Sequence, residues 1–413
     1  MSNIEILNQK IEELNQKLRD CDTELERLNF LLEQERTARE AAEEDSKNKS
    51  NFVAVLSHEI RNPINGIIGM SELLHGTEMN EEQRSYLDII RTSNETLLEL
   101  VNGILDMSRL EAGKMNVQHN PFDLVNTIED LVYTLAPQAF QKKVEVVLDV
   151  ESEIPLFVIG DALKVRQIFM NLMQNAIKFT HEGEVVFELK RIPSLDEKQV
   201  AVSCSVRDTG IGMSEEKLDR IFDVYTQVHE ASGHHYGGAG LGLTITKNLV
   251  DLLGGRIEVT SRRGEGTTIE IILSFERYTD LPSIPFEEDV LDGMNFLVVD
   301  GQGTCRDVIV NMLKGWGATA ESMDKLNDET VKRIGESSFD VVFIDHDTRK
   351  NDDAFRALQD IQDLNLFLLA PLGEKIDDEE RNLFQSIVTK PIRKLHMLNA
   401  ILALDKNNKA ESE

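Results

Sequence analysis

A strict heptad pattern at the start of the chain constrains its fold more than any other feature. Between residues 4 and 32 apolar side chains recur at alternating steps of three and four, at Ile4, Leu7, Ile11, Leu14, Leu18, Cys21, Leu25, Leu28 and Leu32. Glu, Lys and Arg stand between them, so the apolar seam is too narrow for a helix that packs on a globular core. The pattern predicts a two-stranded coiled coil over residues 1–45, and therefore a homodimer.

The composition narrows the class of protein. The 413 residues carry 44 Lys and Arg against 74 Asp and Glu, a formal net charge of −30. Such an acidic chain repels nucleic-acid phosphates and anionic lipid, which argues against both as partners. The cysteines at 21, 204 and 305 have no zinc-site spacing and fit a reducing cytoplasm. No apolar run is long enough to span a membrane and no signal-peptide core is present, so we expect a cytoplasmic protein without a membrane span.

The order of patterns along the chain predicts a multidomain protein. A long helical pattern follows the polar turn HGTEMN and completes a helical hairpin, and two such hairpins in a dimer make a four-helix bundle. Helices mixed with alternating strands then predict an α/β sandwich, and short buried strands alternating with helices predict a doubly wound (βα)5 sheet. The predicted parts are a coiled coil at 1–45, a hairpin at 46–113, an α/β sandwich at 120–277, a linker at 278–292, a doubly wound domain at 293–405 and a tail at 406–413.

The stretch SHEIRNPINGIIG, residues 57–69, places a histidine beside a glutamate in an apolar helical pattern. One stripe of this helix is expected to be buried, made of Phe52, Leu56, Ile60, Ile64 and Ile67. At about 100° per residue, His58 lies about 200° from Leu56 and Ile60 and should face solvent. An exposed imidazole is a competent nucleophile at neutral pH, and the Glu59 carboxylate can orient it and accept its proton. The alternative is an ordinary pair of surface residues.

Polar residues at helical spacing suggest a nucleotide site further along the chain. In RQIFMNLMQNAIKFT, Asn171, Asn175 and Lys178 are four and three residues apart. One helical face therefore offers two amides and an ammonium, a set that could hold a metal and polyphosphate. A plain polar helix face is the rival explanation.

A glycine turn after a predicted strand suggests a base-binding position. The strand ends at Asp208 and continues into DTGIG. The Asp208 carboxylate can accept a hydrogen bond from an exocyclic amine, which favours adenine over guanine, and Gly210 and Gly212 let the backbone approach a flat base. A simple tight turn is the alternative.

Two glycine-rich segments complete this region. GGAGLGL, residues 237–243, stands immediately before a predicted helix, whose free N–H groups and dipole attract phosphate. It is neither a Walker A loop, because GK[ST] is missing, nor a Rossmann fingerprint, which would follow a strand. GEGT, from Gly264 to Thr267, is either a hairpin turn or the floor of the pocket.

Taken in order, these motifs resemble those of sensor histidine kinases. The stretch around His58, the helix with Asn171 and Asn175, DTGIG, IFDVYTQV, GGAGLGL and GEGT carry the resemblance, over about Asn51 to Phe275. It implies a dimerising histidine bundle and a Bergerat-type ATP-binding domain, with ATP and Mg²⁺ as cofactors. The implied activity is phosphorylation of His58 by ATP, followed by transfer to an Asp of a response regulator.

The resemblance also implies roles for single residues. His58 corresponds to the phosphoacceptor, Glu59 to its acid/base partner, and Asn62 to the residue linked to dephosphorylation of a regulator. Phe222 corresponds to an aromatic gripper, Asn175 to the Mg²⁺ ligand, and Asp223 to Ala239 to an ATP lid. The implied nucleotide-binding residues are Asn171, Asn175, Lys178, Asp208, Gly210, Gly212, Phe222, Gly238, Gly240, Leu241, Gly242 and Thr267.

Gyrase-type and mismatch-repair ATPases share the implied ATP-binding fold and are the enzymatic rival. They carry a water-activating Glu at the position of Asn171. Without that carboxylate water is poorly activated, which favours transfer to His58 over hydrolysis.

Residues 293–405 resemble a response-regulator receiver domain, which would make the chain a hybrid kinase. Asp300 ends the first predicted strand, Asp345 ends the third, and Lys390 precedes a proline in VTKPI. They correspond to a metal-site acid, the phosphoacceptor and the phosphate-contacting lysine.

This receiver-like domain departs from its family. Gly301 stands where a second acid is usual, so one Mg²⁺ ligand is missing, although Asp347 could supply a substitute. Ala370 or Pro371 replaces the switch hydroxyl. We therefore expect a degenerate receiver that regulates the kinase. The alternatives are an internal phosphorelay through Asp345 and a signalling scaffold with vestigial catalysis. The sensory partner is not identified by the sequence.

Overall fold

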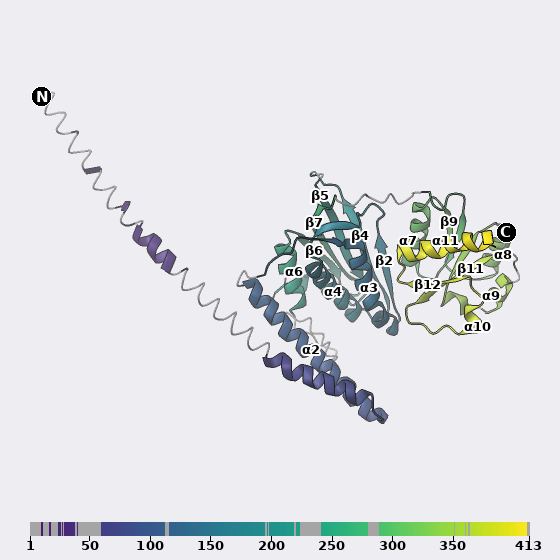
Figure 1. Ribbon diagram of the computed structural model, residues 1–413, viewed down its shortest axis with the longest axis horizontal. Coiled ribbons are helices and arrows are strands. Elements are labelled where there is room, and N and C mark those ends of the chain that lie inside the picture. The colour runs from purple at the N-terminus through teal and green to yellow at the C-terminus, as the bar shows by residue number, and fades with distance from the viewer. Residues whose placement is uncertain are drawn as a thin grey trace. The chain divides into compact units, whose positions relative to one another are not determined.

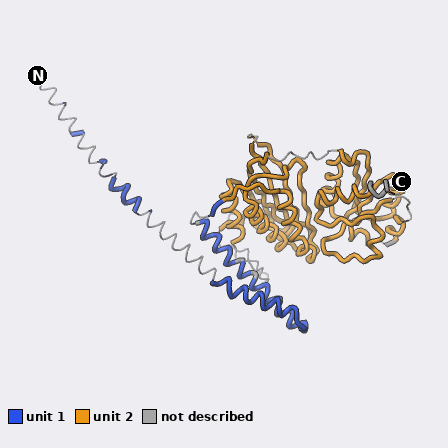
Figure 2. Tube along the Cα trace, viewed as in Figure 1, with its two compact units in different colours: residues 1–116 blue, residues 117–413 orange. Residues whose placement is uncertain are grey.

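The computed structural model of the chain divides into two compact units, Met1–Asn116 and Val117–Glu413 (Figures 1 and 2). The structure describes isolated positions between 10 and 39 and residues 59–410 except 112–114, 195, 197, 219, 224–240, 280–288, 351, 360 and 362–363. Each unit is a body with its own internal packing.

Most of the predicted coiled coil lies outside the described residues. The described positions between 10 and 39 are helical. Two residues of the heptad seam, Leu25 and Leu32, are 58% and 61% exposed. The coiled coil stays a prediction. Within one chain, the Leu25 and Leu32 side chains are exposed to solvent.

Unit 1 contains an antiparallel helical hairpin. Its first helix covers residues 59–75 and its second, α2, covers Glu81–Glu111. A capping box begins α2, because Asn80 and Gln83 each donate a backbone N–H to the other's side chain, at 3.0 and 2.8 Å. Arg61 donates to Asn102 at 2.8 Å, which joins the start of one helix to the later part of the other.

The stripe predicted to be buried on the first helix is only partly buried within one chain. Ile64 is 3% exposed, but Ile60 and Ile67 are 39% and 46% exposed. Phe52 and Leu56 lie outside the described residues. A hairpin of two helices has only one inner face, so burial of the whole stripe stays a prediction that requires the four-helix bundle of a dimer.

Unit 2 begins with a mixed sheet whose strands have the order β1-β3-β7-β5-β4-β2, with β6 beside β7. Among the described strands of this sheet only β2 and β4 pair in parallel. The strands are β1 (Asn120–Asp123), β2 (Val144–Val150), β3 (Phe157–Gly160), β4 (Gly183–Ile192), β5 (Gln199–Asp208), β6 (Arg256–Arg262) and β7 (Gly266–Arg277).

Helices α3 (Leu124–Gln141), α4 (Ala162–Phe179) and α6 (Gly242–Leu252) cover one face of this sheet (Figure 1). A short helix, α5 (Glu215–Leu218), precedes α6. The carboxylates of Asp123 and Asp161 cap α3 and α4 by accepting backbone N–H groups of the first turn. The cap at Asp161 fixes the residue at which α4 begins. The amphipathic pattern of α4 then places one face in the core and the other toward solvent.

A parallel sheet of order β12-β11-β10-β8-β9 follows. Its three central strands, β8, β10 and β11, are apolar and buried on both faces, as a parallel sheet between two helical layers requires. The strands are β8 (Asn295–Val299), β9 (Thr319–Met323), β10 (Val341–Asp345), β11 (Asn365–Pro371) and β12 (Ser386–Lys390).

Helices cover both faces of the parallel sheet. One core cluster contains residues of α7 and α11, and the other contains residues of α8 and α9. The last helix extends five residues into the segment predicted as a tail at 406–413. The helices are α7 (Gly303–Gly315), α8 (Asp328–Glu336), the 3₁₀ helix η1 (Thr348–Lys350), α9 (Asp352–Gln359), α10 (Asp378–Arg381) and α11 (Lys394–Ala410).

We call residues 117–279 the mixed-sheet half and residues 289–410 the parallel-sheet half of unit 2. The two halves share a hydrophobic core, in which Val147 of β2 and Val186 of β4 pack with residues of α7 and α11. Leu291, within the predicted linker, also packs in this cluster and is 1% exposed. The two halves therefore form one compact unit, because apolar side chains of each complete the core of the other.

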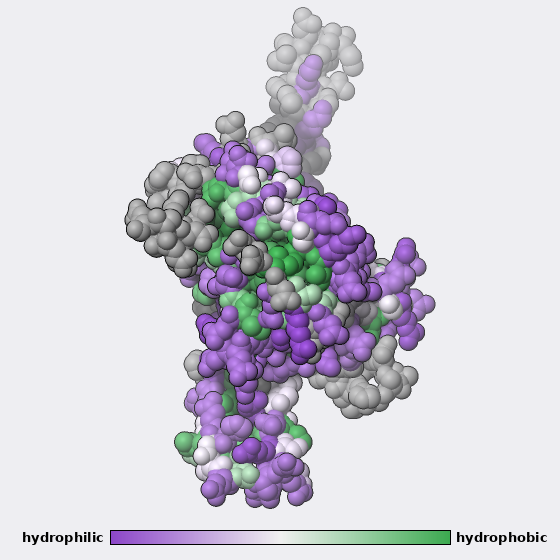
Figure 3. All heavy atoms as spheres, turned by 90° about the vertical axis from the view of Figure 1, so that its right-hand side faces the viewer, coloured by the Kyte–Doolittle hydropathy of each residue, from purple (hydrophilic) through white to green (hydrophobic). Residues whose placement is uncertain are grey.

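Hydrophilic side chains surround a central apolar area on the end of the molecule that the parallel-sheet half forms (Figure 3). Within the part of the chain that the structure describes, no helix has the length and apolar character needed to cross a bilayer.

Candidate functional site

The turn DTGIG is held between a helix end and a hairpin. Asp208 ends β5, and its Oδ1 accepts the backbone N–H of Gly210 at 2.9 Å. Burial raises the pKa of the Asp208 carboxyl, although backbone N–H groups of Gly210 and Thr267 partly oppose this. The backbone N–H of Ile211 donates to the oxygen of Phe179 at the end of α4, at 3.2 Å. The half-buried carboxylate is thus fixed in direction and retains acceptor capacity.

The predicted role of glycine in this turn has a steric basis. Gly212 has φ +60, and an added Cβ would lie 1.9 Å from the backbone oxygen of Arg262. A Cβ on Gly210 would lie 2.4 Å from the oxygen of Phe179. The turn therefore packs directly on neighbouring backbone.

The segment GEGT joins β6 to β7 and supports the same turn. Ser261 accepts the backbone N–H of Met213 at 2.8 Å, and its hydroxyl lies 2.9 Å from that of Thr267. Gly264 donates to the oxygen of Ile211 at 2.7 Å. GEGT is therefore a hairpin turn that also braces DTGIG.

The three polar residues predicted on one face of α4 share that face. Asn171, Asn175 and Lys178 are half-buried, while Leu172, Met173, Ala176 and Ile177 point into the core. Asn171 donates to the backbone oxygen of Gly242 at 3.3 Å, which ties α4 to the start of α6. Lys178 Nζ lies 5.2 Å from the ring centre of Phe179.

Asn175 is the residue of this face that best fits a metal. Its side chain makes no hydrogen bond within the described residues, so its amide oxygen is available, and Mg²⁺ prefers oxygen ligands. No group of three or more acidic, His or Cys side chains among the described residues could hold a metal by itself. A metal here would need phosphate oxygens as further ligands.

The start of α6 lies beside this face. The helix begins at Gly242 after Leu241, and no side chain caps its first turn in the described residues. Its first N–H groups are therefore available to an anion. Thr244 donates from Oγ1 to the backbone oxygen of Phe222 at 2.8 Å, which fixes the backbone at the predicted gripper residue.

Several predicted site residues lie outside the described residues. They are His58, Gly238, Gly240 and all of the predicted lid except Asp223. In unit 1, Glu59 and Asn62 are exposed on the helix at 59–75, three residues apart and so on neighbouring positions of one face.

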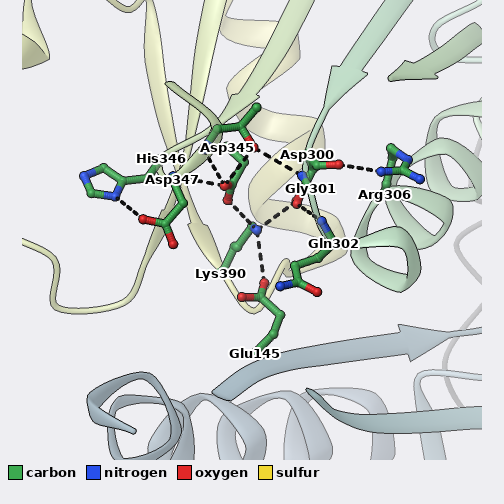
Figure 4. A network of polar contacts seen from close by, with 10 residues as sticks. Glu145, Asp300, Gly301, Gln302, Arg306, Asp345, His346, Asp347 and Lys390 are labelled. Atoms are coloured by element: carbon green, nitrogen blue, oxygen red, sulfur yellow. Dashed lines mark hydrogen bonds and ion pairs between the residues drawn. The ribbon is translucent and has the colours of Figure 1, made fainter. Parts of the chain in front are cut away.

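Asp300, Asp345 and Lys390 meet at the carboxyl edge of the parallel sheet (Figure 4). Lys390 Nζ lies 2.6 Å from Asp345 Oδ1 and 2.8 Å from Asp300 Oδ2. All three are at most 8% exposed. Asp345 Oδ2 also accepts the backbone N–H groups of Asp347 and Thr348, at 3.0 and 3.2 Å.

The geometry of this pocket can be compared with the departures from a receiver that the sequence predicts. Gly301 donates its backbone N–H to Thr348 at 3.2 Å and adds no oxygen ligand. The Asp347 side chain is 77% exposed and turns toward His346 (Figure 4), so it does not substitute for the missing acid. Ala370 is buried at the end of β11 without a hydroxyl to offer.

The sequence did not indicate a fourth member of this pocket. Glu145 of β2, in the mixed-sheet half, reaches Lys390 Nζ at 3.0 Å (Figure 4). Its only signal was a polar residue in the alternating strand VEVVLDV, a pattern shared by any half-buried strand.

Two segments of the chain match known protein families. Residues 48–113 match the His Kinase A (phospho-acceptor) domain. Residues 160–277 match the histidine kinase-, DNA gyrase B-, and HSP90-like ATPase family. The first match contains His58, and the second contains Asn171, Asp208 and Gly242.

Curated relatives are sensor kinases. The chain is 38% identical over 284 residues to the sensor histidine kinase GacS of Pseudomonas protegens, covering 68% of this chain and 30% of that protein. It is 38% identical over 244 residues to the signal transduction histidine-protein kinase BarA of Escherichia coli, covering 59% of this chain and 26% of that protein. The chain thus spans less than a third of the length of these relatives.

A solved structure of the histidine kinase ShkA, full-length in complex with AMPPNP, resembles this fold. The TM-score is 0.65 at 27% sequence identity, over 85% of this chain and 71% of that one. Along this chain a match to a phospho-acceptor domain is thus followed by a match to an ATPase-type domain, and the chain is similar in sequence to sensor histidine kinases.

Proposed function

We propose that this chain uses ATP to phosphorylate His58 and passes the phosphoryl group to an Asp of a separate response regulator. One observation carries the proposal. Asp208, the glycine turn, the polar face of α4 and the start of α6 converge in the domain matched to the ATPase family, which follows a matched phospho-acceptor domain.

Adenine recognition is assigned to Asp208 and the turn after it. The carboxylate accepts a hydrogen bond from the exocyclic amine of adenine, whereas guanine presents a carbonyl at that edge. Gly212 and Gly210 keep the backbone close to the base, because a side chain at either position would collide with neighbouring backbone. The Phe222 ring, Leu241 and Thr267 are proposed as further contacts.

Phosphate binding is assigned to α4 and to the start of α6. Phosphate oxygens would accept hydrogen bonds from the backbone N–H groups of Gly238, Gly240 and Gly242. Lys178 would neutralise negative charge on the phosphates. Asn171 orients this region through its contact with Gly242. Asn175 would hold Mg²⁺ through its amide oxygen, and bound Mg²⁺ would neutralise charge on the polyphosphate.

The transfer step is assigned to His58 and Glu59. A neutral imidazole nitrogen of His58 attacks the γ-phosphorus, the bond from phosphorus to the β-phosphate oxygen breaks, and ADP leaves. The imidazole proton passes to the Glu59 carboxylate. Asn62, exposed on the same helix, is proposed to act when a regulator is dephosphorylated.

We further propose that the chain works as a homodimer in the cytoplasm. The exposed Ile60 and Ile67 of the first helix and the exposed seam residues Leu25 and Leu32 support this. The hairpin of a second chain would cover Ile60 and Ile67 in a four-helix bundle. The N-terminal helix of that chain would cover Leu25 and Leu32 in a coiled coil.

The parallel-sheet half is proposed to be a degenerate receiver that regulates the kinase. Its pocket lacks a second acid at Gly301 and a hydroxyl at Ala370. The stimulus would come from a sensory partner of unidentified chemistry, and the final phosphoacceptor would be the receiver domain of a response regulator.

The test is incubation with γ-labelled ATP and Mg²⁺, comparing the parent with His58→Gln and Asp345→Ala. Phosphohistidine is labile in acid and stable in base, whereas an acyl phosphate is labile in base. We expect acid-labile, base-stable label that is lost in His58→Gln and kept in Asp345→Ala.

Two other outcomes would favour the alternatives. Base-labile label lost in Asp345→Ala would mean an internal phosphorelay through Asp345. No label in the parent, with intact nucleotide binding, would mean a signalling scaffold with vestigial catalysis.

A further inference from the structure

The mixed sheet has an outer face that needs a cover. Residue pairing sets Glu145 beside Glu184, Val147 beside Val186 and Asp149 beside Glu188, and we call these six the outer face. Their neighbours in the two strands point the other way, as Phe187 shows by packing on Phe169 of α4 with ring centres 5.1 Å apart. Helices α3, α4 and α6 therefore leave the outer face to something else.

The parallel-sheet half supplies that cover. Val147 and Val186 are 3% and 6% exposed, although no helix of their own half packs on them. They pack instead in the cluster that contains Val308 and Ile309 of α7. Burying this apolar pair stabilises contact between the halves in proportion to the area removed from water.

Polar contacts around this apolar pair align the two halves. Thr304 of α7 donates to Glu184 Oε1 at 2.9 Å. The hydroxyls of Tyr133 on α3 and Thr389 on β12 lie 3.0 Å apart. Thr389 precedes Lys390, so the strand that ends in the pocket is itself held against α3.

Glu145 enters the acidic pocket from the outer face. The Lys390 ammonium has three N–H donors and three carboxylates around it, from Asp345, Asp300 and Glu145, at 2.6, 2.8 and 3.0 Å. Burial alone would lower the pKa of Lys390, but the anionic groups around it, these carboxylates among them, raise it well above its usual range. The ammonium is therefore charged: it donates a hydrogen bond to Asp345 Oδ1 and forms ion pairs with Asp300 Oδ2 and Glu145 Oε1.

This arrangement opposes phosphorylation of Asp345. If all four groups are ionised, the pocket carries +1 − 3 = −2. A phosphoryl group would add about −1.5 to −2 more beside the Glu145 and Asp300 carboxylates, and the positive charge of Lys390 is already shared by three carboxylates. Glu145 therefore disfavours transfer to Asp345 while it lies in the pocket.

We propose that the receiver-like pocket is an internal docking site for the mixed-sheet half, with Glu145 as the docked group, and that the two halves move as one body. The claim that the two halves move together rests on the proposed function, in which the ATP-binding half must approach His58. The docked state keeps Asp345 from competing with the separate regulator for the phosphoryl group.

Two native cysteines give a test that needs no ATP. Cys305 is 4% exposed and packs in the shared core with Val147, whereas Cys204 is 1% exposed and points from β5 toward the helices of its own half. Separation of the halves would admit a thiol reagent to Cys305 and leave Cys204 protected. The rates are measured by N-ethylmaleimide labelling and peptide mass spectrometry.

We expect Glu145→Gln to raise the labelling rate of Cys305 about tenfold or more without changing that of Cys204, because one charge-assisted contact is lost. Thr304→Val should give a smaller increase. Glu188→Gln is the matched control, since the Glu188 carboxylate contacts Lys190 and Ser205 of its own sheet, and it should change neither rate.

The charge of Glu145 itself raises the pKa of the Cys305 thiol, so Thr304→Val, which changes no charge, is the deciding variant. The proposal is overturned if Thr304→Val leaves the Cys305 rate at the parental value. It is also overturned if both cysteines react together in Glu145→Gln, because Glu145 would then support the whole fold instead of docking. A failed kinase assay would not alter either result, since the labelling is done without nucleotide.

Discussion

The side-chain amide of Asn171 donates to the backbone oxygen of Gly242 at 3.3 Å and so joins α4 to the first residue of α6. The contact brings the polar face of one helix to the free N-terminus of another. These are the two elements to which we assign the phosphates of ATP.

Asn171→Asp should weaken nucleotide binding. The new carboxylate cannot donate to the Gly242 oxygen and adds a negative charge where polyphosphate binds. We expect the dissociation constant for AMPPNP to rise about tenfold or more, measured by isothermal titration calorimetry.

Asn126→Asp is the control for that change. Asn126 is exposed in the first turn of α3, in the same half, and the same substitution there should leave the affinity unchanged. An equal loss in both variants, or no loss in Asn171→Asp, would contradict the assignment.

Asp208→Asn should reduce nucleotide affinity and change the dependence of stability on pH. Burial raises the pKa of Asp208, so its protonated form favours folding, and this contribution is lost as the pH rises through the raised pKa. Asparagine does not titrate. The stability of the variant relative to the parent should therefore increase as the pH rises above the ordinary value for Asp, about 4.

Thermal unfolding without nucleotide, over a range of pH above that value, measures this effect. At neutral pH we expect AMPPNP affinity to fall roughly tenfold, because the amide accepts hydrogen bonds less strongly than the carboxylate. A stability difference that is the same at every pH would show that Asp208 does not titrate as its burial implies.

The nucleotide region could be predicted because each of its parts is local. Asp208 ends a strand and begins a glycine turn, and Asn171, Asn175 and Lys178 share a face by helical spacing alone. The hydrogen bonds from the β6–β7 hairpin to that turn, such as the one between Ser261 and Met213, could not be predicted. They join segments that lie far apart along the chain.

The docking of the two halves was beyond sequence reasoning for a related reason. Glu145 follows the alternation of an ordinary half-buried strand, and its meaning depends on Lys390, in the other sheet. The proline-containing segment at 278–292 suggested separate domains. Val147 and Val186 complete a core that two sheets share, and such a long-range contact leaves no signal in the local pattern of either strand.

Gly212→Ala should destabilise the mixed-sheet half strongly. Its Cβ would lie 1.9 Å from the Arg262 oxygen, so backbone must move in addition to the cost of a positive φ. We expect a loss of about 3 kcal/mol or more in the free energy of unfolding by urea. Gly264→Ala is the matched control, because it has φ +81 but nothing within 4 Å of an added Cβ, and it should cost about 1 kcal/mol. Equal losses would mean that the close contact at Gly212 is relieved at no cost.

Arg393→Ala should weaken the contact between the two halves. The guanidinium lies 4.1 Å from the ring centre of Tyr133 and 2.9 Å from Asp130, so one side chain of the parallel-sheet half stacks on α3 and pairs with it. The Arg393 side chain is 25% exposed but Asp130 is 51% exposed, so most of the effect should come from the stack on Tyr133. We expect a loss of about 1–2 kcal/mol in the free energy of unfolding. Unfolding by urea can be followed through Trp316, the single tryptophan of the chain, which is 2% exposed and packs in the shared core.

Arg333→Ala provides the comparison. Arg333 pairs with Glu321 at 2.8 Å, but both residues belong to the parallel-sheet half and their side chains are 47% and 45% exposed. An exposed pair contributes little because water and salt screen it, so this loss should stay below about 1 kcal/mol. Arg393→Lys keeps the charge but not the planar stack and should fall between the two alanine variants. If Arg393→Ala cost no more than Arg333→Ala, the stack on Tyr133 would not hold the halves together, and docking would depend on Glu145, the contacts of Thr304 and Thr389, and the shared apolar core.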